Sequence, residues 1–286
     1  MEKIGLVVDS TCYLDQKTLE KHNIKTVSLN VLEGEDTVYK ETEITPDFVL
    51  EQIDAGKKLT TAQPSPTLFT DAFDELFDEG YDKVLAIPIS QGISGTYQSA
   101  LIGKEASKRS EDVYVFNTLN AGFGNELMTL EIIRFIEESN SYEEVIARAN
   151  AMIADRGLLF TVQNLFSLQK GGRLSRRQAL LGTVLRIRPI IRLNEDGELK
   201  LIHKERTQTR LMNYFINSIK DHVGDDGTPV VRIVHQKSKE SAAQLKKKLE
   251  ETFQSITITL TDRISPVFSI HIGKKGLGVT WYNAEV

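Results

Sequence analysis

The sequence has a single cysteine and no long hydrophobic run, and each of these absences excludes a class of protein. Cys12 is the only cysteine in 286 residues, so no disulfide can form within the chain. No apolar stretch reaches the roughly 18 residues of a transmembrane helix, and Asp9 interrupts the N-terminal apolar stretch before a signal peptide is complete. We therefore expect a cytoplasmic protein without a transmembrane segment, which makes at most a transient contact with a membrane.

Common catalytic and cofactor-binding motifs are also missing. No stretch matches the pattern G-x-x-x-x-G-K-[ST], which argues against a nucleotide site of the P-loop kind. The histidines show no metal-ligand spacing, and no second cysteine is present to complete a zinc site. The histidines are His22, His203, His222, His235 and His271. We therefore expect no resident metal or cofactor.

Charge is unevenly distributed along a chain of ordinary soluble composition. Hydrophobic residues make up 40% and charged residues 26%, and the length suffices for one large domain or two ordinary ones. The formal net charge is −5, yet the segment from Lys170 to Arg210 holds 11 Lys or Arg against 4 Asp or Glu, so the remainder carries −12. Such a basic segment can bind nucleic acid, a phosphate or an acidic partner, or can be a solvated face.

Periodicity predicts an α/β fold with two domains. In residues 1–155, short β-rich runs alternate with helical patterns, which is typical of a mainly parallel sheet flanked by helices. The predicted strands are Ile4–Val8, Thr26–Val31, Val84–Ile89 and Val113–Phe116. The predicted helices are Asp15–His22, Pro46–Ile53, Pro66–Glu79, Gly95–Arg109 and Gly122–Ser139.

Residues 156–286 have the pattern of an α+β domain with antiparallel pairing. Arg186–Leu193 and Glu198–His203, joined by a turn that ends at Gly197, predict a β-hairpin. The further predicted elements are helices Thr207–Lys220 and Ser238–Thr252 and strands Pro229–His235, Ser255–Leu260, Val267–Ile272 and Gly278–Tyr282. The domain boundary is placed near Asp155, where the pattern changes.

The loop Ser90–Gly95 joins a predicted buried strand to a helix, at the point where open α/β sheets usually bind ligands. Free N–H groups at a helix start favour an anion, and Ser94 and Thr96 add hydroxyl groups to them. Gly95 lets a ligand approach the backbone closely. The loop therefore predicts an anion site, although Ser94 can equally act as a helix cap.

Two more segments carry candidate ligand-binding side chains. The loop Thr60–Pro66 offers Thr61 just before a helical pattern. In the predicted strand Val267–Ile272, a period of two places Ser269 and His271 on one face. A lone histidine is more often structural, so His271 by itself indicates no particular chemistry.

Two alternative functions remain open from the residues alone. Gly92-Ile93-Ser94-Gly95 is one residue short of the nucleophile elbow G-x-S-x-G, which allows a serine hydrolase that uses Ser94 and His271. Nucleic-acid binding through the basic segment is the weaker alternative. That segment has no helix-turn-helix signature and no aromatic residue for stacking on bases.

Six segments, spread in order over nearly the whole chain, resemble the DegV family of fatty-acid-binding proteins. They are Val8-Asp9-Ser10-Thr11, Thr61-Ala62-Gln63-Pro64-Ser65, Ser94-Gly95-Thr96-Tyr97-Gln98-Ser99-Ala100, Lys170-Gly171-Gly172-Arg173-Leu174-Ser175, Arg188-Pro189-Ile190 and His271-Ile272-Gly273. The resemblance implies that one long-chain fatty acid is buried with its carboxylate between two domains. It also implies a non-catalytic, lipid-carrying subunit of a bacterial fatty acid kinase, which presents the fatty acid to a separate ATP-binding subunit that makes acyl phosphate.

The resemblance further implies roles for individual residues. The carboxylate ligands and their neighbours would be Thr61, Ser94, Gly95, Thr96 and His271. Arg173 and Arg206 would face the kinase partner or the phosphate. No nucleic acid would be bound.

The sequence departs from the family pattern at three places near the expected head group. Ala62 replaces a usual serine, and Asn117-Thr118 replaces a usual Asp-Ser pair. Ile272 and Lys274-Lys275 replace the Thr and Pro-Gly that often follow the late histidine. These departures concern the detail of carboxylate binding and leave the class of ligand unchanged.

A fatty acid needs a few converging donors for its head and a deep apolar channel for its tail. Burying about fifteen methylenes at roughly 0.8 kcal/mol each contributes about 12 kcal/mol before ordering costs. The candidate tail-lining residues, each of which is also a candidate for plain core, are Phe166, Leu180, Leu181, Val184, Leu185, Ile187, Ile190 and Phe268.

Overall fold

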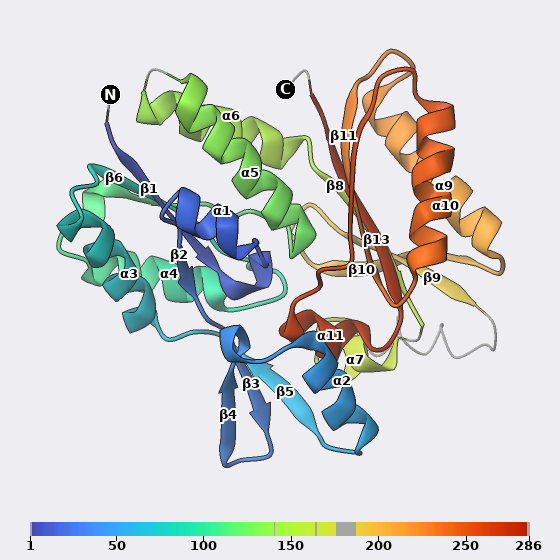
Figure 1. Cartoon of the computed structure of the whole chain (residues 1–286), viewed down its shortest axis with the longest axis horizontal. Coiled ribbons are helices and arrows are strands. Elements are labelled where there is room, and N and C mark those ends of the chain that lie inside the picture. The colour runs from blue at the N-terminus through green and yellow to red at the C-terminus, as the bar shows by residue number, and fades with distance from the viewer. Residues whose placement is uncertain (1, 140, 164, 176–186, 285–286) are drawn as a thin grey trace.

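The computed structural model describes residues 2–139, 141–163, 165–175 and 187–284. Three sheets form its framework. Figure 1 shows the N-terminal sheet with its helices on the left and the C-terminal sheet on the right, with a small third sheet below them. This arrangement confirms the predicted α/β class, with a parallel sheet in the first half and a mostly antiparallel one in the second.

The first sheet is entirely parallel and lies between two layers of helices. Its strands, in spatial order, are β2 (Lys25–Val27), β1 (Ile4–Asp9), β6 (Lys83–Ile87) and β7 (Val113–Val115). Its helices are α1 (Gln16–Lys21), α3 (Pro66–Asp78), α4 (Thr96–Ala106), α5 (Phe123–Glu138) and α6 (Tyr142–Ala154), with 3₁₀ turns at Ser10–Cys12 and Ser110–Asp112.

Alternation along these strands explains the two layers. Val7 and Ala86 pack against the phenylalanines of α3, whereas Val8 and Ile87 pack into the cluster that contains α5 and α6. Successive side chains of a strand point to opposite faces, so a strand covered on both faces is apolar at nearly every position. The continuous run at 84–87 is of this kind.

A small antiparallel sheet was not predicted. In spatial order it contains β4 (Thr37–Lys40), β3 (Asn30–Glu33) and β5 (Leu59–Ala62). A 3₁₀ turn at Glu41–Glu43 and the helix α2 (Pro46–Asp54) connect β4 to β5. The predicted single strand Thr26–Val31 is therefore wrong. The N–H of Leu29 donates to Ser10 Oγ (2.9 Å), so the chain leaves the first sheet there and β3 begins in the second.

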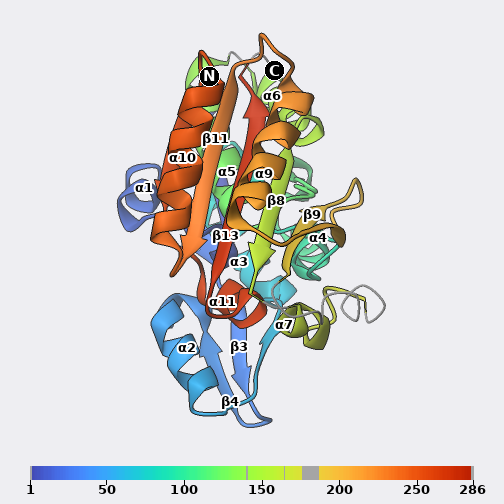
Figure 2. The same cartoon turned by 90° about the vertical axis from the view of Figure 1, so that its right-hand side faces the viewer.

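The C-terminal sheet is mixed and has one parallel pair. Its strands, in spatial order, are β10 (Leu199–Glu205), β9 (Arg188–Leu193), β8 (Gly157–Val162), β13 (Gly276–Asn283), β11 (Pro229–Gln236) and β12 (Thr257–Thr261), and only β11 and β12 run parallel. Its helices are α7 (Phe166–Lys170), α9 (Gln208–Val223), α10 (Lys239–Thr252) and α11 (Pro266–Ile272). Figure 2 shows α9 and α10 on the outer face of this sheet.

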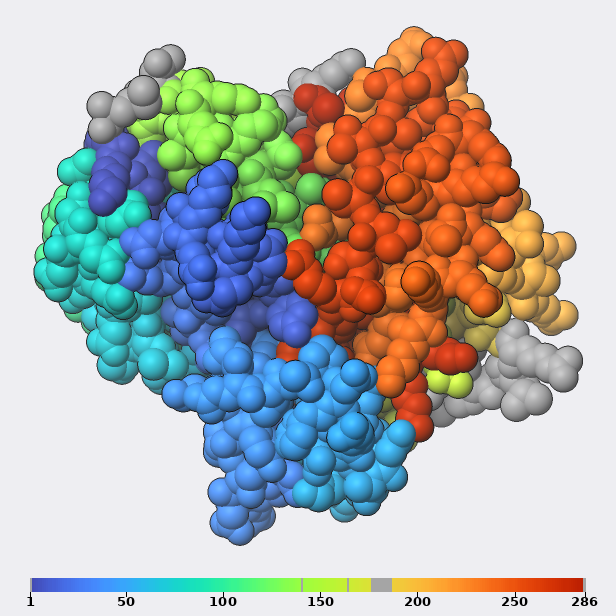
Figure 3. All heavy atoms as spheres, in the orientation of Figure 1, coloured from blue at the N-terminus to red at the C-terminus, as the bar shows by residue number. Residues whose placement is uncertain are grey.

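The division of the strands follows the predicted boundary in sequence. The described strands of the parallel sheet and of the small sheet end at Val115, and those of the C-terminal sheet begin at Gly157. The division into two domains, residues 1–155 and 156–286, stays a prediction. In the space-filling view, the small sheet and α2 form a lobe that meets both the N-terminal and the C-terminal parts of the chain (Figure 3).

Two buried carboxylates connect distant parts of the chain. Glu126 on α5 accepts hydrogen bonds from Arg232 Nη2 on β11 (2.5 Å) and Arg263 Nη2 (2.6 Å). Glu41, which is 1% exposed, accepts from the N–H of Val267 on α11 (2.8 Å) and from the hydroxyl of Ser10. The Glu126 cluster fixes α5 against the C-terminal sheet, because moving the two apart would leave a buried charge without its partner.

Among the helices that the structure describes, none combines the length and the apolar character of a transmembrane span.

Glu41→Gln is expected to change how stability depends on pH. Burial raises the pKa of Glu41 from 4.5 to about 7. The folded state therefore binds more protons than the unfolded state between these values, and the free energy of unfolding falls as pH rises through them. The glutamine variant lacks this contribution, which is on the order of 3 kcal/mol.

Urea unfolding at pH 5, 6, 7 and 8 measures the effect. The wild type should lose stability relative to Glu41→Gln as pH rises, and a stability difference that stays constant over this range would contradict the assignment. Glu43→Gln removes an exposed carboxyl from the same turn and serves as the control.

Candidate functional site

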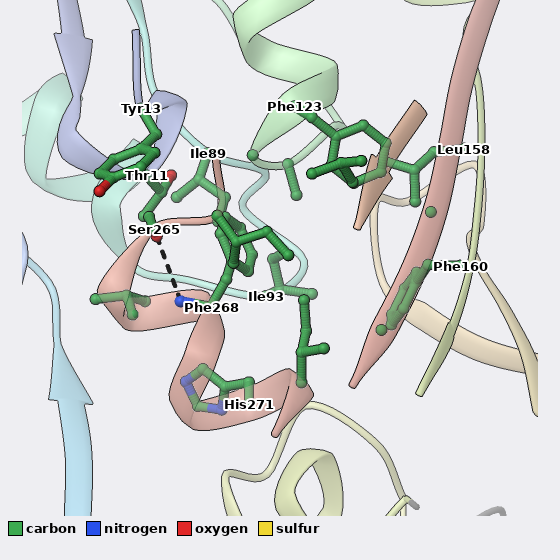
Figure 4. A pocket seen from close by; sticks show the side chains of 18 of the residues that line it. Thr11, Tyr13, Ile89, Ile93, Phe123, Leu158, Phe160, Ser265, Phe268 and His271 are labelled. Atoms are coloured by element: carbon green, nitrogen blue, oxygen red, sulfur yellow. Dashed lines mark hydrogen bonds between the residues drawn. The ribbon is translucent and has the colours of Figure 1, made fainter. Parts of the chain in front are cut away.

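A mostly apolar cavity lies between the carboxyl ends of the parallel strands, the inner face of the C-terminal sheet and α11 (Figure 4). Ligands of open α/β sheets usually bind at this edge, because the loops that follow parallel strands leave a crevice there. The apolar lining residues are Leu29, Ile89, Ile93, Ala121, Phe123, Leu158, Phe160, Leu168, Leu193, Leu199, Val234, Ile264, Val267, Phe268, Ile272 and Leu277.

The segment that carries His271 is a helix, so the predicted strand Val267–Ile272 is wrong. Ser265 is the N-cap of α11 and its hydroxyl accepts from the N–H of Phe268 (3.3 Å), and Pro266 occupies the first helical position. This cap and proline are a helix start signal that outweighs the β-branched residues that follow. The helical spacing turns Val267, Phe268, His271 and Ile272 toward the cavity.

Phe268 reaches its place because its neighbour is a glycine. A Cβ atom on Gly122 would lie 2.8 Å from Cε2 of the Phe268 ring. Gly122 also has a φ of +54°, which side-chain-bearing residues rarely adopt. The ring of Phe268 therefore packs directly on the backbone at the start of α5.

Thr61 and His271 meet at one end of the cavity. Thr61 Oγ1 lies 3.0 Å from His271 Nε2, although the two residues are 210 positions apart in sequence. His271 is 8% exposed, and its buried Nδ1 has no hydrogen-bond partner among the described residues. Burial, with a smaller contribution from the charge of Arg173, lowers the pKa of His271 to about 4. The ring is therefore neutral at physiological pH and carries a single N–H.

Ser94 also lines the cavity and is part of a local hydroxyl pair. Its Oγ lies 2.8 Å from Thr96 Oγ1 and accepts from the N–H of Thr96 at 3.3 Å. Gly95, not Ser94, is the N-cap of α4. Gly95 and Thr96 lie behind Ser94 and outside the cavity wall, with Thr96 fully buried.

The rest of the Ser90–Gly95 loop holds the two halves of the chain together. Ser90, fully buried, donates from its hydroxyl to the carbonyl of Gly197 in the β9–β10 turn (2.9 Å). A Cβ on Gly92 would lie 2.5 Å from the backbone of Gly197, so only glycine fits there. The loop is thus fixed from both sides, and this places Ser94 at the cavity.

The two arginines predicted to face the kinase partner or the phosphate lie in different surroundings. Arg173 lines the cavity, where its Nε donates to the carbonyl of Ile93 (3.1 Å) and its Nη1 to that of Gly171 (2.5 Å). Burial lowers the pKa of Arg173. Arg206 is exposed in the connection between β10 and α9 and does not line the cavity.

Four of the eight predicted tail-lining residues are described by the structure, and of these Phe268 is found in the wall. Phe166 is 66% exposed, which overturns its assignment to the tail site. Ile190 is buried in the cluster that contains α9, and Ile187 is half-buried outside the wall. Leu180, Leu181, Val184 and Leu185 lie outside the described residues, as does part of the basic segment from Lys170 to Arg210.

The missed lining residues come mainly from the start of α5 and from the C-terminal sheet. Phe123 is the first residue of α5, and Leu158 and Phe160 alternate along β8. The short run of apolar, aromatic and β-branched residues at 158–162 was a strand signal that could have been found. The sequence does not show which face of that strand borders a cavity.

The departures from the family pattern occupy three different settings. Ile272 lines the cavity, whereas Ala62 pairs with Asn30 in the small sheet. Asn117 has a buried Oδ1 without a hydrogen-bond partner among the described residues. The hydroxyl of Thr118 donates to the carbonyl of Pro88 (2.9 Å).

The geometry does not form a hydrolase dyad. His271 Nε2 is paired with Thr61 and Ser94 with Thr96, and no hydrogen bond joins Ser94 to His271, both of which the structure describes. A serine nucleophile needs its base within hydrogen-bond reach. Within the described ranges, no group of three or more His, Cys, Asp or Glu side chains is placed to hold a metal ion.

Comparisons with known proteins agree with the fold and the resemblance. The DegV family model, described as "Uncharacterised protein, DegV family", matches residues 3–284. A DegV domain-containing protein of Halalkalibacterium halodurans is 29% identical over 286 residues, which cover 99% of each chain. A similar relative in Staphylococcus aureus is 30% identical over 283 residues, which cover 98% of each.

Solved structures give the same result. A DegV family protein from Thermus thermophilus, described as binding fatty acid, is 26% identical with a TM-score of 0.88 over 98% of this chain and 99% of that one. DegV of Bacillus subtilis, described as a fatty acid binding protein, is 25% identical with a TM-score of 0.85 over 99% and 100%. Because the family model spans almost the whole sequence, the chain belongs to the DegV family.

Proposed function

We propose that this protein binds one long-chain fatty acid in the cavity, with the carboxylate at Thr61, Ser94 and His271. The single observation that carries the proposal is the arrangement of the cavity, whose walls are mostly apolar and where the Thr61 hydroxyl meets the neutral imidazole of His271. The charged residues Glu126 and Arg263, which also line it, are paired with each other. A site with a few polar groups and a long apolar wall matches a ligand with one polar head and an apolar tail. The fatty-acid binding described for the Thermus thermophilus and Bacillus subtilis relatives supports it.

The carboxylate is held chiefly by hydrogen bonds. Thr61 Oγ1 and His271 Nε2 share one hydrogen bond, so when the neutral imidazole donates to Thr61, the Thr61 hydroxyl donates to the carboxylate. Ser94 offers a second hydroxyl. Hydrogen bonds to a charged group contribute about 1.5–3 kcal/mol each, which is enough to orient the head. Arg173, whose guanidinium lies in the cavity wall, supplies the positive charge that offsets the desolvation of the carboxylate.

We further propose that the bound fatty acid is presented to a separate ATP-binding kinase subunit, which forms the acyl phosphate. The sequence has no P-loop, so in this proposal the nucleotide comes from the partner. Arg206 is the candidate contact, because it is exposed, positively charged and outside the fatty-acid site. The surroundings of Arg173 favour a head-group role for that residue over a purely partner-facing one.

Mass spectrometry of lipids extracted from gently purified protein tests the ligand. We expect a stoichiometric long-chain fatty acid in the wild type. Thr61→Ala and Ser94→Ala should each weaken rebinding of hexadecanoic acid by about tenfold to a hundredfold, because each removes a hydrogen bond to a charged group.

Matched controls lie on the helices of the outer face. Ser218→Ala on α9 and Thr252→Ala on α10 remove hydroxyls that bond only to carbonyls of their own helix. They should bind hexadecanoic acid like the wild type. A wild-type protein that carries no lipid and takes up none would refute the proposal, and cleavage of a nitrophenyl ester that Ser94→Ala abolishes would replace it with a hydrolase.

Gly171→Ala tests the position of the imidazole. The backbone of Gly171, with φ −72°, accepts alanine without strain, but the added Cβ would lie 2.7 Å from His271 Nδ1. The ring must move away, so we expect the affinity for hexadecanoic acid to fall about tenfold while the free energy of unfolding changes by less than about 1 kcal/mol. Isothermal titration and urea unfolding measure the two quantities.

The control for this variant is Lys170→Ala, which removes an exposed side chain at the end of the same helix. Unchanged affinity in Gly171→Ala would show that the imidazole takes no part in binding.

Arg206→Ala tests presentation to the partner. It should bind hexadecanoic acid with wild-type affinity, yet lower the rate of acyl phosphate formation with an ATP-binding fatty acid kinase subunit by about tenfold or more, as expected for a lost contact to a phosphate or acidic group. Lys17→Ala makes the same charge change on exposed α1 and is the control. Equal rates for the two variants would refute the contact at Arg206.

A further inference from the structure

Glu41 is a buried carboxylate that touches the helix carrying His271 while lying outside the cavity wall. It comes from the turn after β4, far from α11 in sequence. Its Oε1 accepts from the N–H of Val267 at 2.8 Å. The hydrogen bond therefore joins α11, at its second residue, to the N-terminal part of the chain.

The carboxylate is itself held rigidly. Ser10 donates its hydroxyl to Glu41 Oε2 and accepts from the N–H of Leu29 at 2.9 Å. The N–H of Glu41 donates to the carbonyl of Leu29 at 2.9 Å. Glu41 is thus bonded through its side chain to Ser10, which follows β1, and through its backbone to Leu29. These contacts fix the position of its carboxyl group independently of α11.

Because α11 is short, the position of its first turn determines the position of His271 near its end. It has seven residues, and His271 lies four residues, or about 6 Å of helix rise, beyond Val267. At its start α11 is held by Glu41 and at its end by the contact of His271 with Thr61. A displacement of the first turn therefore moves the imidazole relative to Thr61.

We propose that Glu41 is a positioning residue for the carboxylate site: by holding the first turn of α11, it sets the place of His271 beside Thr61. This inference rests on the proposed function, because the group that it positions is assigned there to the fatty-acid head. Glu41 does not touch the fatty acid.

The role predicts a selective loss that a structural role does not. The acid and the alcohol of the same chain length share the tail, but the carboxylate depends more strongly on a correctly placed imidazole. If Glu41 positions His271, its loss lowers the affinity for the acid more than the affinity for the alcohol. If Glu41 only stabilises the fold, both affinities fall together.

The experiment measures binding of hexadecanoic acid and hexadecan-1-ol to Glu41→Ala, Glu41→Asp and Glu41→Gln. In the alanine and aspartate variants we expect the ratio of acid to alcohol affinity to fall by at least about fivefold, because the hydrogen bond to Val267 is lost or out of reach. Glu41→Gln retains an oxygen that can accept from Val267 and should keep the ratio within about twofold of the wild type. If Glu41→Ala does not fold, Glu41→Asp decides.

Asp74→Ala is the matched control for Glu41→Ala. Asp74 on α3 accepts from the hydroxyl of Ser107 (2.6 Å) and the N–H of Lys108 (3.2 Å), the same donor types as at Glu41, but it lies away from the cavity. An unchanged ratio in both Glu41→Ala and Glu41→Asp, with the wild type binding acid normally, would overturn this inference and leave the proposed function standing. A wild type that binds neither ligand would overturn both.

Discussion

The hydrogen bond between Thr61 and His271 is the contact on which the arrangement of the site depends. It joins β5 of the small sheet to α11 across 210 residues of chain. Around it the Ser90–Gly95 loop is fixed by the hairpin turn, and α11 is fixed by Glu41. Thr61 and Glu41 come from the small sheet and the turn after β4, the Ser90–Gly95 loop follows β6 of the parallel sheet, and its hairpin contact belongs to the C-terminal sheet. The polar end of the cavity therefore exists only when all three sheets are assembled.

The charged and the neutral polar side chains that line the cavity differ in how far they are hydrogen-bonded. Glu126 and Arg263, which both line it, are paired with each other, and Glu126 also with Arg232. By contrast, burial keeps His271 neutral, and its Nδ1 has no partner among the described residues. A buried polar atom without a hydrogen-bond partner costs free energy, and a ligand that supplies the partner recovers it. Charges that are already paired with each other gain less from a ligand. Among the described side chains that line the cavity, His271 thus has a buried polar atom without a partner.

The family comparison shows how little identity this architecture needs. At 26% identity the Thermus thermophilus relative superposes with a TM-score of 0.88. In this chain a few glycines lie where backbone and side chain touch. Gly122 beneath Phe268 and Gly171 beside His271 are positions of this kind, because an added Cβ would collide with the side chains of the site.

The sequence by itself determined most of the parallel sheet with helices α1, α3, α4 and α5, but not α6. It also determined the β9–β10 hairpin and, through motif resemblance, the candidate residues Thr61, Ser94 and His271. Periodicity and turn residues act over a few positions, so they can be read locally. Only the tertiary structure decided that α11 is a helix held by Glu41, that Phe166 is exposed, and that Phe123 and Phe160 line the cavity. An apolar side chain satisfies a core or a cavity equally well, and which one it meets depends on how distant elements pack.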